Sequence, residues 1–256
     1  MPLLVFTDLD GTFLSHTDYS WEAARPALER LIAIGAGIVM ASSKTAPEIE
    51  VLRRQTGLAA FPAIVENGAG LLEPDAQAAV DLAEYRKLRT ALDRTPAQLR
   101  AHFTGFGDMD VARIADVTGL APGAAVLAAQ RAFSEPGIWS GTESEKGAFL
   151  AALADQGLSA REGGRFLTLS TGQTKADRMA QITGRYTPRH TVALGDAPND
   201  VEMLETADFG IVIANPQRSP LPPLDGETTG RITRSARAGP DGWNDTLLDL
   251  IKRLNL

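Results

Sequence analysis

The feature that most constrains the fold is the stretch 5–14, which reads Val-Phe-Thr-Asp-Leu-Asp-Gly-Thr-Phe-Leu. Its apolar residues predict a buried strand, and the Asp-Gly-Thr that follows predicts a turn. Asp8 and Asp10 would therefore stand at the end of a strand, which is where ligands bind in open α/β sheets. A turn with no function would use the same residue types, so the rest of the chain has to decide between the two interpretations.

The segments that follow alternate between helix and strand. Apolar residues at helical spacing predict a helix over 21–35, and apolar runs predict strands at 38–41 and 63–66. A second helix is expected to begin near Thr45, because Thr45 is a good N-cap, a proline follows near the start, and Glu48 completes a capping box. This alternation is typical of a parallel, doubly wound α/β sheet of the Rossmann-like kind with right-handed crossovers.

The pattern changes near residue 82 and returns after residue 170. Between these points the sequence predicts an α+β unit with a break at Pro136 and Gly137. We therefore predict a catalytic core of residues 1–81 and 168–256 and an inserted domain of residues 82–167. The predicted elements of the insert are helices at 82–101, 110–118, 122–133 and 145–156 and a strand at 166–169; those of the second part of the core are helices at 174–183, 201–206 and 243–254 and strands at 191–194 and 209–213.

Composition excludes several classes of function. The net charge of −7 and the pI near 5.1 argue against a nucleic acid or an anionic membrane as partner. The absence of cysteine excludes disulfides, thiolate catalysis and cysteine-based zinc sites. No apolar stretch approaches the ~20 residues of a membrane span, so we expect a cytoplasmic protein. The oligomeric state is left open.

Polar residues follow four of the predicted strand ends or helix starts. Hydrolysis of a phosphate monoester needs a nucleophile, a proton donor for the leaving oxygen, and positive charge near the phosphoryl oxygens. A carboxylate such as Asp8 can form an aspartyl-phosphate, and Asp8 with Asp196 suits Mg²⁺, which prefers oxygen ligands. Ser42 would donate a hydrogen bond to a phosphoryl oxygen, and Lys175 would neutralise both phosphate and Asp8. Each residue alone has an ordinary structural explanation, but their order along the chain favours phosphate chemistry.

These motifs, Asp-Leu-Asp-Gly-Thr at 8–12, Ser42, Lys175 and Gly-Asp-Ala-Pro-Asn-Asp at 195–200, resemble those of the haloacid dehalogenase-like superfamily. The resemblance implies a phosphohydrolase in which Asp8 is the nucleophile and Asp10 the general acid and base. It also implies that Ser42 and Lys175 bind the phosphate.

The same resemblance implies a Mg²⁺ cofactor. The ion would be held by Asp8, the backbone carbonyl of Asp10, and Asp196, with Asn199 and Asp200 in support. The insert between the second and third motifs resembles the C2-type cap of Cof-type phosphatases, which covers the substrate and sets specificity.

A further set of short motifs extends over most of the chain. The motifs are Ser-Ser-Lys-Thr at 42–45, Glu-Asn-Gly at 66–68, Gly-Phe-Gly-Asp-Met at 105–109, Gln-Arg at 130–131, Gly-Gly-Arg-Phe at 163–166 and Gly-Pro-Asp-Gly at 239–242. Together they resemble those of the mannosyl-3-phosphoglycerate phosphatase family, which produces the compatible solute mannosylglycerate. This narrower resemblance implies a small phosphorylated sugar-glycerate substrate contacted by Ser43, Lys44, Asn67, Arg131 and Arg165.

Several alternatives stay open at this point. Glucosyl-3-phosphoglycerate differs only at the sugar, and a phosphatase for sucrose, trehalose or hexose phosphate would use the same core residues. A phosphomutase would also keep them. A noncatalytic binding protein is disfavoured, because it has no need of both Asp8 and Asp10.

Overall fold

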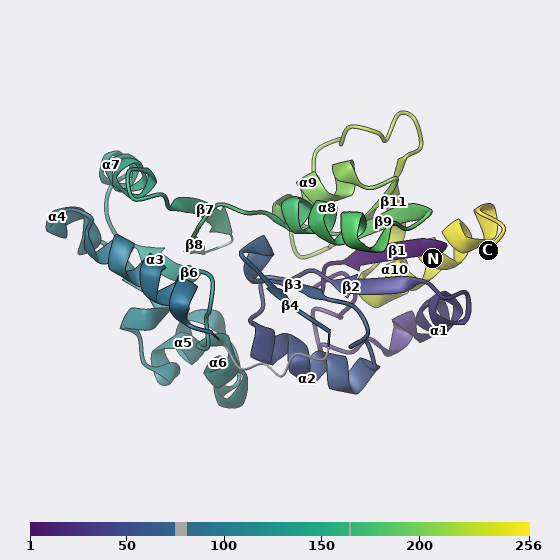
Figure 1. The fold of residues 1–256 in the computed structure, drawn as a ribbon, viewed down its shortest axis with the longest axis horizontal. Coiled ribbons are helices and arrows are strands. Elements are labelled where there is room, and N and C mark those ends of the chain that lie inside the picture. The colour runs from purple at the N-terminus through teal and green to yellow at the C-terminus, as the bar shows by residue number, and fades with distance from the viewer. Residues whose placement is uncertain (75–80, 164) are drawn as a thin grey trace.

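The computed structural model describes residues 1–74, 81–163 and 165–256. Figure 1 shows two lobes, one containing both chain termini and the other formed by the middle of the chain. The larger lobe is built on a parallel sheet of five strands, whereas the smaller lobe is built on an antiparallel sheet of four. The predicted α/β fold with an additional α+β unit is confirmed.

The parallel sheet places the first strand between partners from opposite ends of the sequence. Val5 in β1 pairs with Ile38 on one side and Val192 on the other. Because β1 and β9 are parallel neighbours in the sheet, their carboxyl ends lie side by side at one edge. The strand order is β11 (Ile232–Ala238), β10 (Phe209–Ala214), β9 (His190–Gly195), β1 (Leu3–Thr7) and β2 (Gly37–Met40).

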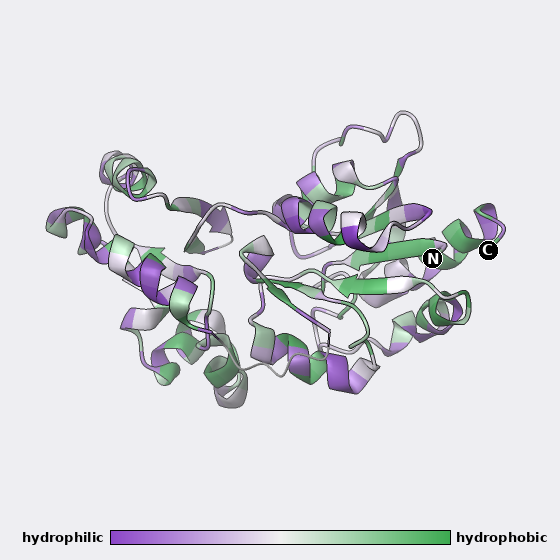
Figure 2. Ribbon diagram, viewed as in Figure 1, coloured by the Kyte–Doolittle hydropathy of each residue, from purple (hydrophilic) through white to green (hydrophobic). Residues whose placement is uncertain are grey.

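Alternate residues of β1 enter two hydrophobic cores because successive strand side chains point to opposite faces. Leu3 and Val5 pack in one core with residues of α1, α2 and α10, and Leu4 and Phe6 pack in the other with α8 and α9. Figure 2 shows the central strands as predominantly hydrophobic. These helices are α1 (Arg25–Ala33), α2 (Ala46–Thr56), α8 (Lys175–Tyr186), α9 (Val201–Thr206) and α10 (Gly239–Arg253).

Two parts of the core differ from the sequence-based expectation. The strand predicted at 63–66 is β3 (Ala63–Val65), which pairs antiparallel with β4 (Gly70–Leu72). Its link to the five-stranded sheet is a single parallel bridge between Ile64 and Ala41, the residue that follows β2. β11 was not predicted. Its sequence is polar, and most of its side chains are partly or fully exposed, because it lies at the edge of the sheet.

The antiparallel sheet of the insert corrects another expectation. The break predicted at Pro136 and Gly137 is wrong, because both residues lie inside β6 (Glu135–Trp139), between β5 and β8. A Cβ on Gly137 would lie 2.3 Å from the Phe103 ring, so close packing and not a turn explains this glycine. The other strands are β5 (Phe103–Gly105), β7 (Ser159–Gly163) and β8 (Phe166–Ser170).

Helices cover the insert sheet, and two clusters of apolar side chains hold them in place. Residues of α3 and α7 pack with Leu167 and Leu169 of β8, and residues of α5 and α6 pack with Phe166, which points to the other face. The division into core and insert stays a prediction, and β8 continues the insert's sheet to Ser170. The helices are α3 (Ala83–Asp93), α4 (Ala97–Arg100), α5 (Val111–Thr118), α6 (Pro122–Ala128) and α7 (Glu143–Ala154).

Across residues 1–74, 81–163 and 165–256, no single helix has the length and apolar character needed to cross a membrane. The pair α5 and α6 meets that criterion only when joined, and the two are bent by 103° at the break between them.

Candidate active site

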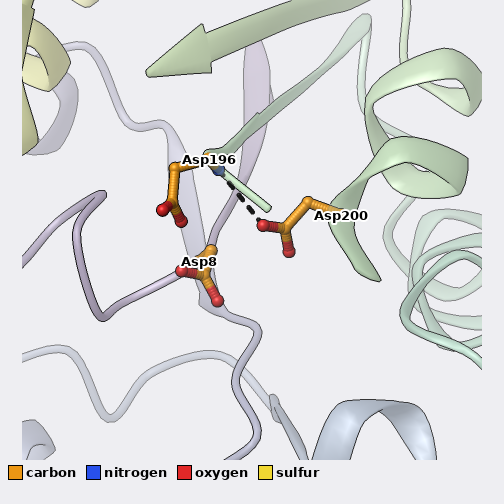
Figure 3. Close-up of side chains that lie close together, drawn as sticks. All are labelled: Asp8, Asp196 and Asp200. Atoms are coloured by element: carbon orange, nitrogen blue, oxygen red, sulfur yellow. Dashed lines mark hydrogen bonds between the residues drawn. The ribbon is translucent and has the colours of Figure 1, made fainter. Parts of the chain in front are cut away.

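Three buried carboxylates meet at the carboxyl edge of the parallel sheet. Asp8 follows β1 and Asp196 follows β9, while Asp200 lies in the short 3-10 helix η4 (Pro198–Asp200). One oxygen from each lies within 4.8 Å of the others, and Figure 3 shows the side chains grouped together. The register explains the meeting: Thr7 pairs with Leu194, so Asp8 comes level with Gly195, the residue before Asp196. The predicted convergence of these strand ends is what the structure shows.

Lys175 neutralises part of this cluster. Its ammonium Nζ lies 2.6 Å from Oδ1 of Asp8 and 2.7 Å from Oδ1 of Asp200, and its side chain is only 1% exposed. The residue opens α8, whose N-cap Thr174 forms a capping box with Asp177. The first turn of a helix therefore delivers this lysine into the site.

A glycine allows α8 to come this close. Gly68 has φ of +98°, and a Cβ there would lie 2.1 Å from the carbonyl carbon of Thr174. Arg178, one turn into the helix, donates hydrogen bonds to the carbonyls of Gly68 and Ala69. The loop after β3 is thus fastened to the helix that carries Lys175.

The electrostatics of the cluster favour a cation. Burial raises the pKa of Asp8 well above its ordinary value, and the charge of Asp200 raises it further, against the opposing effect of Lys175. Burial and Asp200 likewise raise the pKa of Asp196. Burial alone would lower the pKa of Lys175, but the charges of Asp200 and Asp8 raise it above the usual lysine value. Three buried carboxylates and one buried ammonium leave an excess of buried negative charge that a divalent cation would compensate.

The donor set fits a hard metal ion, because every candidate ligand is a carboxylate oxygen. Asp200 is already engaged: Oδ1 accepts from Lys175, and Oδ2 accepts from the backbone amides of Asp196 and Ala197. Asp8 and Asp196 also accept hydrogen bonds, Asp8 from Lys175 and Asp196 from Thr12 and Asn215. Asp8 and Asp196 as direct ligands, with Asp200 in support, therefore stay predictions.

Four residues around Asp196 were not singled out as site residues by the sequence. Thr12 donates to Oδ1 of Asp196 over 3.2 Å, and Asn215 donates to Oδ2 over 2.5 Å. His16 and Arg218 each place a nitrogen 3.9 Å from Oδ2. Asn215 directly follows β10, so the rule of polar residues at strand ends could have found it. His16 and Arg218 give no comparable signal, because only the folded loops bring them here.

Asp10 and Lys44 form a second charged pair at the site. Nζ of Lys44 lies 2.9 Å from Oδ2 of Asp10, whereas the buried Oδ1 of Asp10 has no hydrogen-bond partner among the described residues. Burial alone would lower the pKa of Lys44, but the charges of Asp10 and Glu48 and the hydrogen bond to Asp10 raise it overall. The predicted general acid thus has one oxygen held and one unpaired.

Ser42 is buried at the end of β2 and lies in a short loop whose backbone is fixed. Its hydroxyl oxygen accepts from the backbone amide of Lys44 over 3.2 Å, and its carbonyl accepts from that of Asn67 over 2.8 Å. The Oδ1 atom of Asn67 in turn accepts from Asn199 over 3.1 Å. Hydrogen bonds therefore link Ser42, Asn67 and Asn199, and Asn199 lies in η4 beside Asp200.

The remaining predicted substrate residues lie in different surroundings. Ser43 is exposed, and its carbonyl accepts from the guanidinium of Arg131. Arg131 itself is buried beside Glu66. Arg165 is exposed, with its guanidinium carbon 6.0 Å from the ring centroid of Phe166. Gly164, part of the motif quoted above, lies outside the described residues. The roles of these residues in substrate binding stay predictions.

Asp196→Asn tests the metal assignment. The amide keeps the shape of the side chain but removes a negative charge from the cluster, so we expect the Mg²⁺ concentration for half-maximal activity to rise by about 10-fold or more. A magnesium titration of activity measures this. Asp208→Asn, which changes a carboxylate at the opposite end of the neighbouring strands, serves as the control. An unchanged titration for Asp196→Asn would count against its role as ligand.

Solved structures with the same fold match along the whole chain. A phosphatase of the haloalkanoate enzyme superfamily from Bacteroides thetaiotaomicron has a TM-score of 0.65 at 18% identity, covering 100% of this chain and 96% of that one. The sucrose-phosphatase of Synechocystis sp., solved with sucrose and phosphate, has a TM-score of 0.64 at 16% identity, with 100% and 99% covered. A subclass IIB sugar phosphatase has a TM-score of 0.61 at 17% identity, with the same coverage. At such identities the likeness shows the fold.

The sequence itself matches the family described as haloacid dehalogenase-like hydrolase over residues 5–87 and 162–219. The matched segments include Asp8, Ser42, Lys175 and Asp196, and they leave out most of the insert. With more than half of the chain matched and the acidic cluster at the expected edge of the sheet, this protein belongs to the haloacid dehalogenase-like hydrolase family.

Proposed function

We propose that this protein is a Mg²⁺-dependent phosphomonoester hydrolase that removes the phosphate from mannosyl-3-phosphoglycerate to give mannosylglycerate. The observation that carries the phosphatase proposal is the buried Lys175, which bridges Asp8 and Asp200 beside Asp196. A fixed ammonium and a site for a divalent cation next to a carboxylate are what a phosphoryl group needs during transfer.

The proposed reaction has two steps. In the first, a carboxylate oxygen of Asp8 attacks phosphorus and the bond from phosphorus to the substrate oxygen breaks, while Asp10 gives that oxygen a proton. In the second, Asp10 takes a proton from water as the water oxygen attacks the aspartyl-phosphate, which releases inorganic phosphate and restores Asp8. Ser42 and Lys175 hold the phosphoryl oxygens throughout. Mg²⁺, held by Asp8, Asp196 and the carbonyl of Asp10, would supply further positive charge.

The substrate assignment rests on the cations outside this cluster. Mannosyl-3-phosphoglycerate carries a carboxylate as well as a phosphate, and Lys44 and Arg165 are candidates to bind it. The Lys44 ammonium offers a point charge, and the Arg165 guanidinium suits bidentate carboxylate recognition. A second candidate is a simpler sugar phosphate, favoured by the fold shared with a sucrose-phosphatase and a sugar phosphatase. Glucosyl-3-phosphoglycerate is the nearest alternative.

A panel of substrates tests the proposal. Phosphate release with Mg²⁺ is compared for mannosyl-3-phosphoglycerate, glucosyl-3-phosphoglycerate, sucrose phosphate, trehalose phosphate and an aryl phosphate at equal concentration. A strong preference for a glycerate conjugate supports the assignment, and the ratio of the two conjugates identifies the sugar. Activity spread over the hexose phosphates contradicts the substrate, and no activity on any of the five contradicts the hydrolase function.

Arg165→Ala tests the carboxylate contact. We expect KM for the glycerate-bearing substrate to rise by about 10-fold, because a charged hydrogen-bonding partner is lost, while hydrolysis of the aryl phosphate stays close to normal. Arg86→Ala, which removes another exposed arginine of the insert, is the matched control. Equal losses on both substrates would place Arg165 in catalysis or folding instead.

A further inference from the structure

Glu66 is a buried acid at the junction of the two lobes. It follows β3 in the 3-10 turn η2 (Glu66–Gly68), is 2% exposed, and has φ of +51°, a left-handed conformation that is uncommon outside glycine and asparagine. Its carboxylate accepts hydrogen bonds from the amides of Ala132 and Phe133, over 2.9 and 3.2 Å, and from the Ser134 hydroxyl over 2.7 Å. A core residue thus binds three successive residues of the insert.

Arg131 extends this contact to the phosphate side of the site. Its Nε lies 3.3 Å from Oε2 of Glu66, its Nη2 donates to Ser134 over 2.7 Å, and its Nη1 donates to the carbonyl of Ser43 over 3.1 Å. The Thr45 hydroxyl has two acceptors at 3.0 Å, the carbonyl of Leu127 and Oε2 of Glu48. Segment 127–134 of the insert therefore touches the core loop on both sides of Lys44, and Figure 1 shows α6 next to α2.

Backbone hydrogen bonds also join loop 42–45 to the 3-10 turn η2, both of which belong to the core. The amide of Glu66 donates to the carbonyl of Lys44 over 2.9 Å, and that of Asn67 donates to the carbonyl of Ser42 over 2.8 Å. Phe133 packs on the core so closely that a Cβ on Gly70 would lie 2.2 Å from its ring. The Glu66 backbone thus binds loop 42–45 directly. The Glu66 side chain binds the same loop indirectly, because it pairs with Arg131, which donates to the carbonyl of Ser43.

We infer that Glu66 and Arg131 are positioning residues for the phosphate site, which hold Ser42 and Lys44 in place by pinning loop 42–45 to segment 127–134. The inference rests on the proposed function, in which Ser42 binds the phosphate and Lys44, paired with Asp10, contacts the substrate. Both charges are buried, and each needs the other, because a buried charge without its partner is strongly disfavoured. In this inference Arg131 acts through the loop, in place of the direct substrate contact that the sequence resemblance implies for it.

Glu66→Gln tests the inference, with inorganic phosphate as the probe. Glutamine keeps the size of the side chain but loses the charge, so Arg131 is held less firmly. We expect the affinity for phosphate, measured by calorimetry with Mg²⁺ present, to fall by about 10-fold. KM for an aryl phosphate should rise more than kcat falls. The affinity for Mg²⁺ should stay unchanged, because Asp8 and Asp196 are not part of the network.

Glu135→Gln is the matched control. Glu135 is equally buried and binds Tyr85, Arg89 and the amide of Gly107, all within the insert. Its variant should leave the phosphate affinity at the wild-type value. Equal losses in the two variants would overturn the inference, because they would reflect a general loosening of the insert.

Arg131→Lys is the second test variant if Glu66→Gln does not fold. Lysine keeps the positive charge but lacks the planar guanidinium whose separate N–H groups reach Glu66 and the Ser43 carbonyl at the same time. We therefore expect the same loss of phosphate affinity. An unchanged phosphate affinity in a folded variant overturns the positioning role. Because the probe is phosphate, failure of mannosyl-3-phosphoglycerate as a substrate would contradict the proposed function while these variants still decide the inference. Wild-type protein that binds no phosphate would overturn both.

Discussion

Asp8→Asn is expected to lower kcat by at least about 10⁴-fold on every phosphate ester, because the amide is neither charged nor a competent nucleophile. The fold should survive. Burial and Asp200 raise the pKa of Asp8, so the charged side chain is disfavoured in the folded protein, and a neutral amide of the same shape relieves that effect. Phosphate release measures the activity, and thermal unfolding with and without Mg²⁺ measures stability.

The matched control is Asp18→Asn, which removes an exposed carboxylate on the loop after the first turn. It should change neither activity nor melting temperature measurably. Substantial turnover by Asp8→Asn would remove Asp8 as the nucleophile, whereas inactivity together with a lost unfolding transition would show only that the variant does not fold.

Lys175→Met is expected to damage both stability and activity. Removing the ammonium leaves Asp8 and Asp200 buried without their cation, and breaking a buried ion pair in this way costs about 3–5 kcal/mol of unfolding free energy. The loss should be largest in EDTA. Mg²⁺ should restore part of it, because a divalent cation can neutralise the same carboxylates. Urea unfolding under the two conditions measures the difference.

Lys87→Met provides the comparison, since Lys87 is an exposed lysine paired with Glu84 on α3. Exposed pairs contribute about 0–1 kcal/mol, so its effect should be small. A loss of less than about 1 kcal/mol for Lys175→Met would mean that the bridge between Asp8 and Asp200 does not hold the site together, contrary to the buried-pair argument.

Local signals allowed much of the core to be predicted from the sequence. The helix that starts after Thr45 has the expected capping box, with Thr45 and Glu48 bonded reciprocally. The apolar runs at 38–41 and 191–194 fall on β2 and β9. These features depend on neighbouring residues alone, which is why a sequence can indicate them.

The predictions that failed concern pairing between segments that are distant in the sequence. Pro136 and Gly137 suggested a break because both are rare in strands, but the packing of Gly137 against Phe103 makes the position suitable for β6. β11 has no apolar run and becomes a strand because β10 offers it an edge. Glu66 gave no sign of its burial, since its partners lie more than 60 residues away.

The sequence by itself determined which residues stand at strand ends, and hence that Asp8 and Asp196 belong to one edge of a parallel sheet. Only the tertiary structure decided that Lys175 is a buried bridge between Asp8 and Asp200, that Asn215 holds Asp196, and that Arg131 is buried against Glu66. The physical reason is that strand and helix signals are local, whereas the burial and pairing of a charge depend on groups that the fold brings together from far along the chain.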